Sequence, residues 1–339
     1  MIFGHQKIRQ ILQNQAKDGN LSHAYLFFGP EGIGKKMVAL EFSRALLCLN
    51  GHDGRFCSEC DSCRLFEAGI YPHTKQSYGV GAHPDFQFIG PETEETRKSS
   101  RTREIGISFI RQLIGWNKLK PILAPRKVAV IDDAQWLSVE AQNAFLKSLE
   151  EPAGSTVFIL VAPSPGDLLE TVVSRCRKIK FLPLGFEDFK KALGGLDAES
   201  ARLSELHAIY SGKPGPAFLF AAPDGQKEFD RRRAEFLGMF RRDFANRYRF
   251  SEGLARDEKA VFEAVDLWRV LTRDLIFAKS GLSGALANRL LAPDIAKEAQ
   301  NHQLEKLVRI FKLLGRLSFS LKETNLSPRL ALDWVMTEL

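Results

Sequence analysis

The sequence predicts an α/β fold, in which helices cover both faces of a parallel β-sheet, followed by a region built of helices alone. Three observations support this class. Up to Leu184, short apolar runs typical of strands alternate with amphipathic runs typical of helices. A glycine-rich loop joins the first of these strands to the helix that follows it. Beyond Leu184 the strand-like runs stop, while helical periodicity continues.

The predicted elements of the sheet region follow one another in a regular order. Ile8, Ile11 and Leu12 lie at helical spacing, which predicts a first helix that ends at Gly19. The runs predicted as strands are 23–29, 86–90, 126–137, 155–163 and 177–184. The runs predicted as helices are 36–49, 107–119, 138–152 and 166–176.

Two polar stretches are predicted to be loops. Residues 69–85 are polar and rich in glycine, and residues 91–103 are charged and low in apolar side chains. A segment of the second kind cannot bury enough apolar surface to order itself. We therefore expect residues 91–103 to form a solvated loop that moves in the free chain.

Length and composition limit the function classes. The chain has 339 residues, 44% hydrophobic and 26% charged, which is ordinary globular composition for two or three domains. No run approaches the roughly 18 apolar residues that span a bilayer, and the start lacks the pattern of a secretion signal, so we expect a cytoplasmic protein without membrane contact. The net charge of +7 favours an anionic partner such as DNA or RNA, although many proteins carry such a charge and bind neither.

The stretch GPEGIGKK, residues 29–36, matches the phosphate-loop pattern G-x-x-x-x-G-K through Gly29, Gly34 and Lys35, with Gly32 inside the loop. In such a loop, successive backbone N–H groups surround phosphate oxygens at a helix N-terminus, whose dipole favours an anion. Lys35 would reach the terminal phosphates of a nucleotide. A tight turn without a ligand is the alternative, and the strand before the loop and the helix after it weigh against that alternative.

Three positions needed for ATP hydrolysis depart from the usual pattern. Lys36 stands where a serine or threonine hydroxyl normally binds magnesium. Asp132 is suited to hold magnesium through water, but Asp133 stands where glutamate orients the attacking water, and a misplacement of about 1 Å can cost about a hundredfold in rate. The next strand ends at Ala162 and Pro163, whose side chains cannot bind phosphate. The sequence therefore allows ATP or ADP with Mg²⁺ to bind but predicts little turnover; a simple strand-end turn is the alternative for the two acids.

Four of the five cysteines form a cluster, Cys48, Cys57, Cys60 and Cys63, in the pattern C-x8-C-x2-C-x2-C. C-x2-C turns supply thiolate ligands at the separation that tetrahedral zinc requires. A redox pair or unpaired thiols are the alternatives. We expect a structural Zn²⁺, because four thiolates leave no coordination position for catalysis and the segment has little apolar content of its own. The histidines near the cluster are expected to be surface residues: His52, His73 and His83.

Several motifs occur in a fixed order: HAYLFFGPEGIGKKMVALEFSRALLC, the cysteine cluster, AHPDF, KVAVIDDAQWLSVEAQNAFLKSLEEP and LLETVVSRC. Together they resemble the bacterial DNA polymerase III clamp loader, the family of its gamma/tau and delta-prime subunits, strongly over roughly the first 185 residues and loosely beyond. The resemblance implies an AAA+ P-loop core over 1–184 with a zinc-binding insertion at 48–63. It further implies an all-α lid over 185–225 and an all-α collar, or oligomerisation, domain over 226–339. The stretch 71–82 is longer than this family usually carries, and we assign it no role.

Two departures resemble the delta-prime branch of the family. In the ATP-hydrolysing gamma/tau branch the loop ends in lysine plus serine or threonine, whereas here it ends Lys35-Lys36. The motor lid carries a phosphate-sensing arginine, whereas here Pro214 and Gly215 occupy that stretch. The resemblance implies a stator-like subunit with weak or absent ATP hydrolysis. Its partners would be gamma/tau and delta in a hetero-pentamer that loads the sliding clamp onto primed DNA, while another subunit polymerises.

The resemblance also assigns a role to the SRC motif. Arg175 resembles the arginine finger that projects into the nucleotide site of a neighbouring subunit. A guanidinium suits this role because it is always charged and donates bidentately to phosphate oxygens. A surface arginine at a helix end is the alternative, and Ser174 and Cys176 at the family's positions weigh against it.

Two other functions stay open. A gamma-type motor would bind and hydrolyse ATP itself, and it would depend on Lys35. A zinc-bearing nucleic-acid binder could use the arginines and aromatic residues of 231–250 to follow a phosphate backbone. We favour a simple amphipathic helix for this stretch, with Phe236, Phe240 and Phe244 as its apolar stripe and a solvated basic face.

Overall fold

A computed structural model of the chain describes residues 4–70, 83–90, 104–151, 155–194, 199–221, 223–323 and 326–339. The chain divides into two compact units, Met1–Asp188 and Phe189–Leu339. The further division of the second part into a lid that ends at residue 225 and a collar stays a prediction. Some predictions fall outside the described residues: those for the stretch 71–82, the loop 91–103 and His73.

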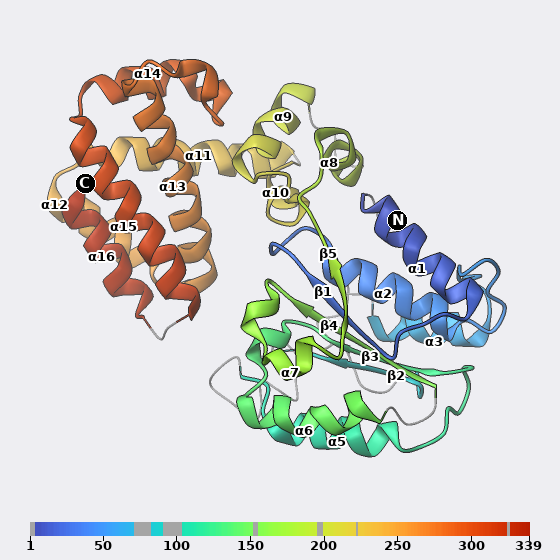
Figure 1. The fold of residues 1–339 in the computed structure, drawn as a ribbon. Coiled ribbons are helices and arrows are strands. Elements are labelled where there is room, and N and C mark those ends of the chain that lie inside the picture. The colour runs from blue at the N-terminus through green and yellow to red at the C-terminus, as the bar shows by residue number, and fades with distance from the viewer. Residues whose placement is uncertain are drawn as a thin grey trace. The chain divides into compact units, whose positions relative to one another are not determined.

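The first unit contains a five-stranded parallel sheet with the strand order β2-β3-β4-β1-β5 (Figure 1). Its strands are β1 (Ala24–Phe28), β2 (Phe86–Ile89), β3 (Lys127–Ile131), β4 (Thr156–Ala162) and β5 (Arg177–Lys180). Leu26 of β1 lies opposite Leu160 of β4 on one side and Lys178 of β5 on the other. The loop after β1 therefore leaves the sheet between two neighbouring strands, where open α/β sheets commonly bind ligands.

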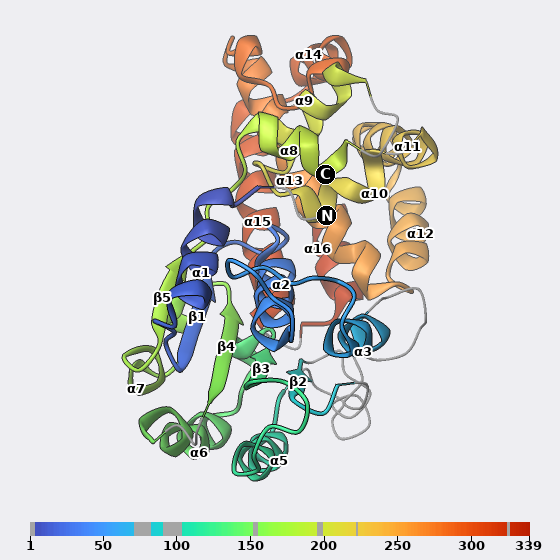
Figure 2. The same ribbon diagram turned by 90° about the vertical axis from the view of Figure 1, so that its right-hand side faces the viewer.

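Helices cover both faces of this sheet. They are α1 (Gln6–Asp18), α2 (Lys35–Leu47), α3 (Asp61–Ile70), α5 (Ile107–Asn117), α6 (Val139–Glu150) and α7 (Glu170–Val173). Helices α1 and α2 lie over one face of the sheet, and α5 and α6 lie over the other (Figure 2). Side chains alternate along β1, so that Tyr25 and Phe27 pack in the core beneath α1 and α2, while Leu26 packs in the core beneath α5 and α6. A parallel sheet buried on both faces needs such apolar strands.

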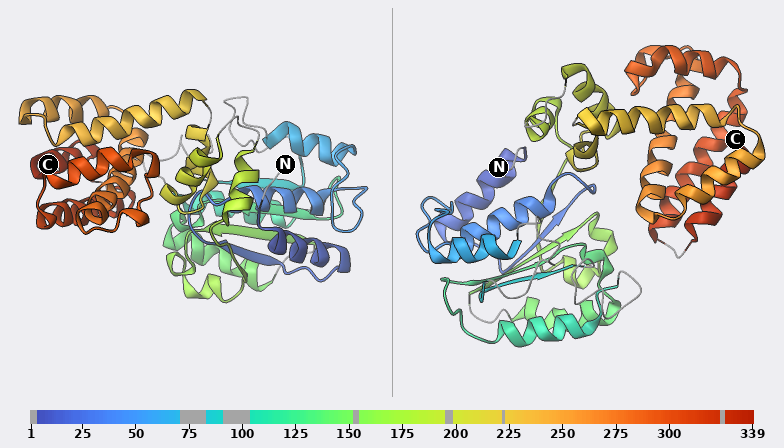
Figure 3. Two further views of the ribbon diagram at one scale, coloured as in Figure 1. Left: turned by 90° about the horizontal axis from the view of Figure 1, so that it is seen from above. Right: turned by 180° about the vertical axis from the view of Figure 1, so that it is seen from behind.

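The second unit contains no strand among its described residues. Its helices are α8 (Phe186–Leu193), which spans the division between the units, α9 (Ser200–Ile209), α10 (Pro214–Ala221), α11 (Pro223–Met239), α12 (Phe244–Leu254), α13 (Glu258–Lys279), α14 (Ala292–Gln300), α15 (Leu304–Glu323) and α16 (Pro328–Glu338). The long helix α13 packs against α11, α14, α15 and α16 (Figure 3). Trp268 of α13 stacks on Phe236 of α11, with ring centroids 5.3 Å apart. The predicted fold class, an α/β core followed by an all-α region, is confirmed.

The arginine-rich stretch 231–250 does not form the single predicted helix. Helix α11 ends at Met239, and the Asp243 side chain caps α12 by accepting the N–H of Asn246 at 2.8 Å. Phe236 is buried, but Phe244 is 57% exposed. The predicted apolar stripe is therefore wrong at its third member, because the break at Asp243 turns the following helix away from the first.

A buried ion cluster joins α9 to α11. Arg233 is 1% exposed, and its Nη1 lies 2.9 Å from Oε1 of Glu205, a carboxylate with no exposure. Arg202 donates to Glu205 Oε2 at 2.8 Å, and the backbone N–H of Leu290 donates to Oε1 at 3.0 Å. Each carboxylate oxygen thus has a donor, which a buried charge requires. The cluster links the predicted lid segment to the predicted collar segment within one unit.

Candidate functional site

The phosphate loop leaves the end of β1 and runs into α2. Gly29, Gly32 and Gly34 have φ angles of 146°, 72° and 100°, which glycine adopts at little cost. A Cβ atom on Gly29 would lie 2.4 Å from the carbonyl oxygen of Phe181, so no side chain fits there. The Gly29 N–H donates to the carbonyl oxygen of Pro163 at 3.1 Å and ties the loop to the end of β4.

Lys35 is the first residue of α2 and is only 7% exposed. Its ammonium donates to the carbonyl oxygens of Gly29 at 2.6 Å and Pro30 at 2.8 Å. These two hydrogen bonds hold the Lys35 side chain across the phosphate loop. A positive charge is therefore fixed beside the backbone N–H groups of the helix N-terminus, an arrangement that favours phosphate.

Lys36 reaches across to the end of β3, which lies two strands from β1 in the sheet. Its Nζ lies 2.8 Å from Oδ2 of Asp132, the residue directly after β3. Asp132 is 7% exposed, and the Lys36 ammonium also lies 5.3 Å from the ring centroid of Phe88. Magnesium requires oxygen ligands and keeps several waters, whereas this position offers an ammonium in place of the usual hydroxyl. These residues do not fit Mg²⁺.

Asp133 forms the turn that follows Asp132. Its φ of 50° is left-handed, it precedes the short 3₁₀ turn Ala134–Trp136, and its Oδ1 accepts a hydrogen bond from Gln135 at 3.2 Å. Burial and the neighbouring charge of Asp132 raise the pKa of Asp133. The alternative of a strand-end turn thus has direct geometric support, and a role toward water stays a prediction.

His5 closes one side of the phosphate loop, and the sequence gives no signal for it. Its Nε2 lies 2.7 Å from the carbonyl oxygen of Ile33, and its ring packs edge-on against Phe181 with centroids 4.8 Å apart. Burial lowers the pKa of His5. The neutral ring can therefore donate its Nε2–H to Ile33 and brace the loop.

Arg175 lies just after α7, between the exposed residue Ser174 and the buried residue Cys176. Cys176 is 7% exposed and packs in the core beneath α5 and α6, which anchors the motif. The guanidinium of Arg175, about a third exposed, donates to Glu150 Oε1 at 2.5 Å and to the carbonyl oxygen of Thr171 at 2.9 Å. Its side chain is thus at the surface, and both of its bonds are accessible to solvent.

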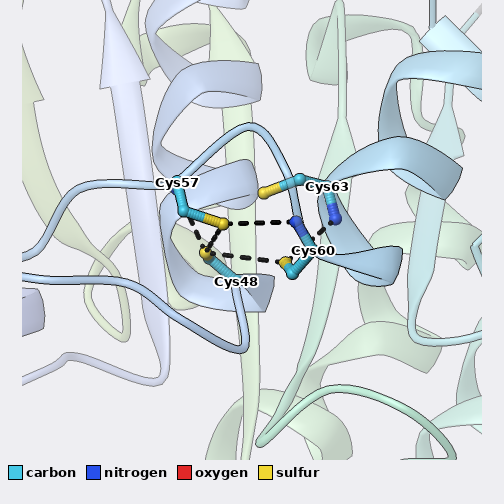
Figure 4. Close-up of side chains that lie close together, drawn as sticks. All are labelled: Cys48, Cys57, Cys60 and Cys63. Carbon is cyan, nitrogen blue, oxygen red and sulfur yellow. Dashed lines mark hydrogen bonds between the residues drawn. The ribbon is translucent and has the colours of Figure 1, made fainter.

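The four cysteine sulfur atoms lie within 4.8 Å of one another, and all four are free thiols (Figure 4). Cys48 ends α2 and Cys63 lies in the first turn of α3, a helix that the sequence does not predict. Backbone N–H groups of Cys60 and Cys63 donate to the sulfur atoms of Cys57 and Cys60, at 3.4 and 3.5 Å. Such a cluster of four soft ligands can bind a metal ion.

The environment of Cys60 favours a thiolate. Burial alone would raise its pKa, but backbone N–H groups of Cys63 and Leu49 and the neighbouring thiols lower the pKa of Cys60 to about 6. Burial raises the pKa of Cys48 to about 12. Deprotonating all four thiols therefore requires a positive charge at the centre, which a bound metal ion supplies.

The prediction that His83 is a surface residue is wrong. His83 is 4% exposed, its Nδ1 accepts the N–H of Asp85 at 3.1 Å, and its Nε2 lies 2.8 Å from Oγ of Ser62. Ser62 in turn donates to the carbonyl oxygen of Leu47 at 2.6 Å. This chain of hydrogen bonds fastens α3, next to the cysteines, to α2 and to the segment before β2. His52 is exposed, as predicted.

Asp85 is a buried residue with a structural role that sequence reasoning missed. Its carboxylate accepts the backbone N–H groups of Ile122, Leu123 and Ala124 at 2.7, 2.7 and 2.8 Å. Burial pushes the pKa of Asp85 upward, but these donors outweigh burial and lower it. An acid directly before an apolar strand, in AHPDF, was the available signal.

Among the described helices, none is long and apolar enough to cross a membrane.

The curated proteins to which this chain is similar include several subunits of DNA polymerase III. The chain is 36% identical over 198 residues to the DNA polymerase III subunit delta' of Pseudomonas aeruginosa, a match that covers 57% of this chain and 54% of that protein. It is 30% identical over 178 residues to the delta' subunit of Bacillus subtilis, covering 52% and 47% of the two chains. The chain thus spans about half the length of these curated relatives.

Two further relatives carry a gamma designation. The DNA polymerase III subunit tau/gamma of Haemophilus influenzae is 34% identical over 175 residues, which cover 52% of this chain and 22% of that protein. A solved structure of a DNA polymerase III gamma subunit-related protein from Thermotoga maritima aligns over 98% of this chain and 97% of its own, with 18% identity and a TM-score of 0.44. The family model described as DNA polymerase III, delta subunit, matches residues 4–185, more than half of the chain. The chain therefore belongs to this DNA polymerase III delta-subunit family of clamp-loader proteins.

Proposed function

We propose that this chain is a delta-prime subunit of the DNA polymerase III clamp loader, a cytoplasmic protein that helps to load the sliding clamp onto primed DNA. Its partners are gamma/tau and delta subunits in a hetero-pentamer, and it reaches clamp and DNA through that complex. Its own ATP hydrolysis is weak or absent. Its contribution to catalysis is Arg175, which acts on ATP bound by a neighbouring subunit. Family membership and the two delta' relatives support this assignment.

The observation that carries the proposal is the ion pair between Lys36 and Asp132, 2.8 Å from Nζ to Oδ2. In a motor subunit, the hydroxyl at the first of these positions and the carboxylate at the second hold the magnesium ion of ATP. Here the two side chains bind each other. Asp133 is also poorly suited to orient a water molecule, because its backbone is left-handed and its carboxylate accepts a hydrogen bond from Gln135 within the same turn. A chain with this pair is expected to hydrolyse ATP poorly even when ATP or ADP occupies Gly29 to Lys35.

Arg175 has the properties that an arginine finger needs. Its guanidinium is partly exposed, its backbone is anchored by buried Cys176, and its partner Glu150 is itself about half exposed. An exposed ion pair of this kind contributes only about 0–1 kcal/mol. The guanidinium can therefore leave Glu150 for the phosphates of a neighbour at little cost, and there it would stabilise charge that develops in the transition state.

The cysteine cluster is proposed to hold a structural Zn²⁺. The donor set supports this identity: four cysteine sulfur atoms within 4.8 Å of one another, with backbone N–H groups donating to three of them. Zinc binds four thiolates tetrahedrally and has no redox chemistry. The ion would join the end of α2 to the start of α3. It would shape the surface of the unit and take no part in ATP chemistry.

A gamma-type motor subunit is the second candidate, favoured by the retained geometry of the glycine loop and of Lys35 and by the tau/gamma relative. The steady-state ATPase rate of the purified chain separates the two. A delta-prime subunit alone should show little or no turnover, while the complex reconstituted with gamma/tau and delta should hydrolyse ATP. Turnover by the lone chain at the rate of the complex, abolished in K35A, would reject the proposal in favour of a motor.

A further inference from the structure

The phosphate loop and β3 together lack a place for a magnesium ion. The usual arrangement needs one hydroxyl on the residue after the loop lysine and one carboxylate at the end of another strand of the sheet, here β3. Lys36 offers three N–H donors and no acceptor, so it cannot be a metal ligand. Its Nζ lies 2.8 Å from Oδ2 of Asp132, the carboxylate that would otherwise hold a metal-bound water.

The surroundings hold this pair in place. Asp132 is 7% exposed, and its backbone N–H donates to the carbonyl oxygen of Ile89 at 2.8 Å, which fixes the residue against β2. The Lys36 side chain is 29% exposed and passes the ring of Phe88, so its ammonium is partly shielded from water. Partial burial strengthens the attraction between opposite charges relative to water. A divalent cation near the same carboxylate would be repelled by the ammonium.

The adjacent acid cannot substitute for Asp132. Asp133 has a left-handed backbone and its carboxylate accepts from Gln135 at 3.2 Å, so it belongs to the turn. The phosphate cradle, by contrast, is intact: the glycine at position 29 touches the Phe181 carbonyl, and the Lys35 ammonium lies on the loop carbonyls. The loop therefore retains groups for phosphate and lacks groups for the metal.

We infer that the Lys36 ammonium takes the place of the metal ion at this loop, so that any nucleotide phosphate bound there is bound without Mg²⁺. The inference rests on the proposed function in one respect, that residues 29–36 form a phosphate loop. It goes beyond the loss of hydrolysis, because it names one side chain that decides whether the loop depends on magnesium. Exchanging that side chain for a hydroxyl should restore the dependence.

The test is the affinity of the full chain for ADP, measured by equilibrium dialysis with Mg²⁺ and in magnesium-free buffer without chelator, which leaves the cysteine site intact. In the wild type, Mg²⁺ should leave ADP affinity unchanged. K36T supplies the hydroxyl and releases Asp132, and Mg²⁺ should tighten its ADP binding about tenfold or more, within the usual range for two coupled ligands. In K36T/D132N, the ratio of the ADP affinity with Mg²⁺ to that without Mg²⁺ should return to about one.

Lys17 offers a matched control, because its Nζ lies 2.8 Å from Asp53 Oδ1 in an ion pair far from the loop in sequence. K17T should behave as the wild type does.

K36S serves as a second variant if thermal unfolding shows that K36T is not folded. Magnesium-enhanced ADP binding by the wild type would overturn the inference, as would a folded K36T or K36S chain without magnesium dependence. A wild type that binds no ADP with or without Mg²⁺ would also overturn the inference, because the ammonium would then not replace the metal ion in holding phosphate. None of these results involves Arg175 or the complex, so failure here is distinguishable from failure of the proposed function.

Discussion

The Arg175 guanidinium is held by Glu150, the last residue of α6, with Nη2 2.5 Å from Oε1. Glu150 belongs to α6, whereas Arg175 follows the end of α7, and both side chains are partly exposed, by 34% for Arg175 and 48% for Glu150. An ion pair at this exposure is worth about 0–1 kcal/mol. The pair therefore orients the guanidinium without fixing it, as the proposed role of an arginine finger requires.

Glu150 should act as a weak competitor for Arg175. In E150Q the guanidinium loses its charged partner, so the ATPase rate of the reconstituted complex should stay the same or rise by up to about fivefold, the factor that corresponds to about 1 kcal/mol. Steady-state ATP hydrolysis by complexes with wild-type or E150Q chain measures this. A marked fall in rate would mean that Glu150 supports Arg175 in its working position instead of competing with the phosphate.

The purified chain should contain about one zinc ion, as four thiolates imply. C60S removes a ligand and should lower the zinc content to about none, together with the midpoint of thermal unfolding, because the ion links the end of α2 to α3. Elemental analysis and thermal unfolding measure the two effects. Cys176 lies outside the cluster and provides the control: C176A should keep its zinc. A zinc-free wild type, or a C60S chain that retains zinc, would exclude the structural site.

Asp85 should make stability depend on pH. Its pKa is lowered in the folded chain from the usual 3.8, so its contribution is present above pH 3.8 and is lost as the pH falls through the lower, folded value. D85N weakens bonds to three backbone N–H groups, that of buried Ala124 among them, and should cost about 2–3 kcal/mol at pH 7. The difference in the free energy of unfolding between D85N and the wild type should become smaller below pH 3.8. Urea unfolding at several pH values checks this, and a difference that does not change with pH would contradict it.

Glu205 should be essential to the second unit. It has no exposure and carries the charge that balances Arg202 and Arg233, so E205Q leaves a buried guanidinium short of a partner and should cost about 3 kcal/mol or more. Denaturant unfolding of the variant measures the loss. The control is E235Q, which removes a partly exposed partner of the exposed Arg231 side chain and should change stability by about 0.5 kcal/mol or less. Equal stability of the two variants would show that the cluster is not holding α9 to α11.

Local pattern was enough for those features whose parts lie close together in the sequence. Strand, glycine loop and helix follow one another within residues 23–49, so the phosphate loop could be predicted between the first strand and the helix that follows it. The cysteine cluster could be predicted because its spacing carries the information. Family resemblance added the role of Arg175, which its helix-end position alone would not have suggested.

Features that depend on contacts between distant residues could not be predicted. Lys36 meets Asp132 only because β3 lies two strands from β1 in the sheet, an order that no local pattern contains. The buried His83 ring forms a hydrogen bond with the hydroxyl of Ser62, which lies on α3. Helix α3 was not predicted from the sequence, because the segment around it is polar in composition. The break before α12 had a local signal, since Asp243 is a strong helix N-cap, but the regular spacing of phenylalanines outweighed it in the prediction.

The central claim is that this chain contributes an arginine to its neighbour's ATP chemistry while hydrolysing little ATP itself. Single-turnover ATP hydrolysis by the reconstituted complex, with wild-type, R175A or R175K chain, tests it most directly. Both variants should assemble normally and slow hydrolysis at one site by about a thousandfold or more, since lysine keeps the charge but lacks the bidentate donors. Hydrolysis at the wild-type rate and amplitude in a complex that carries R175A would contradict the account.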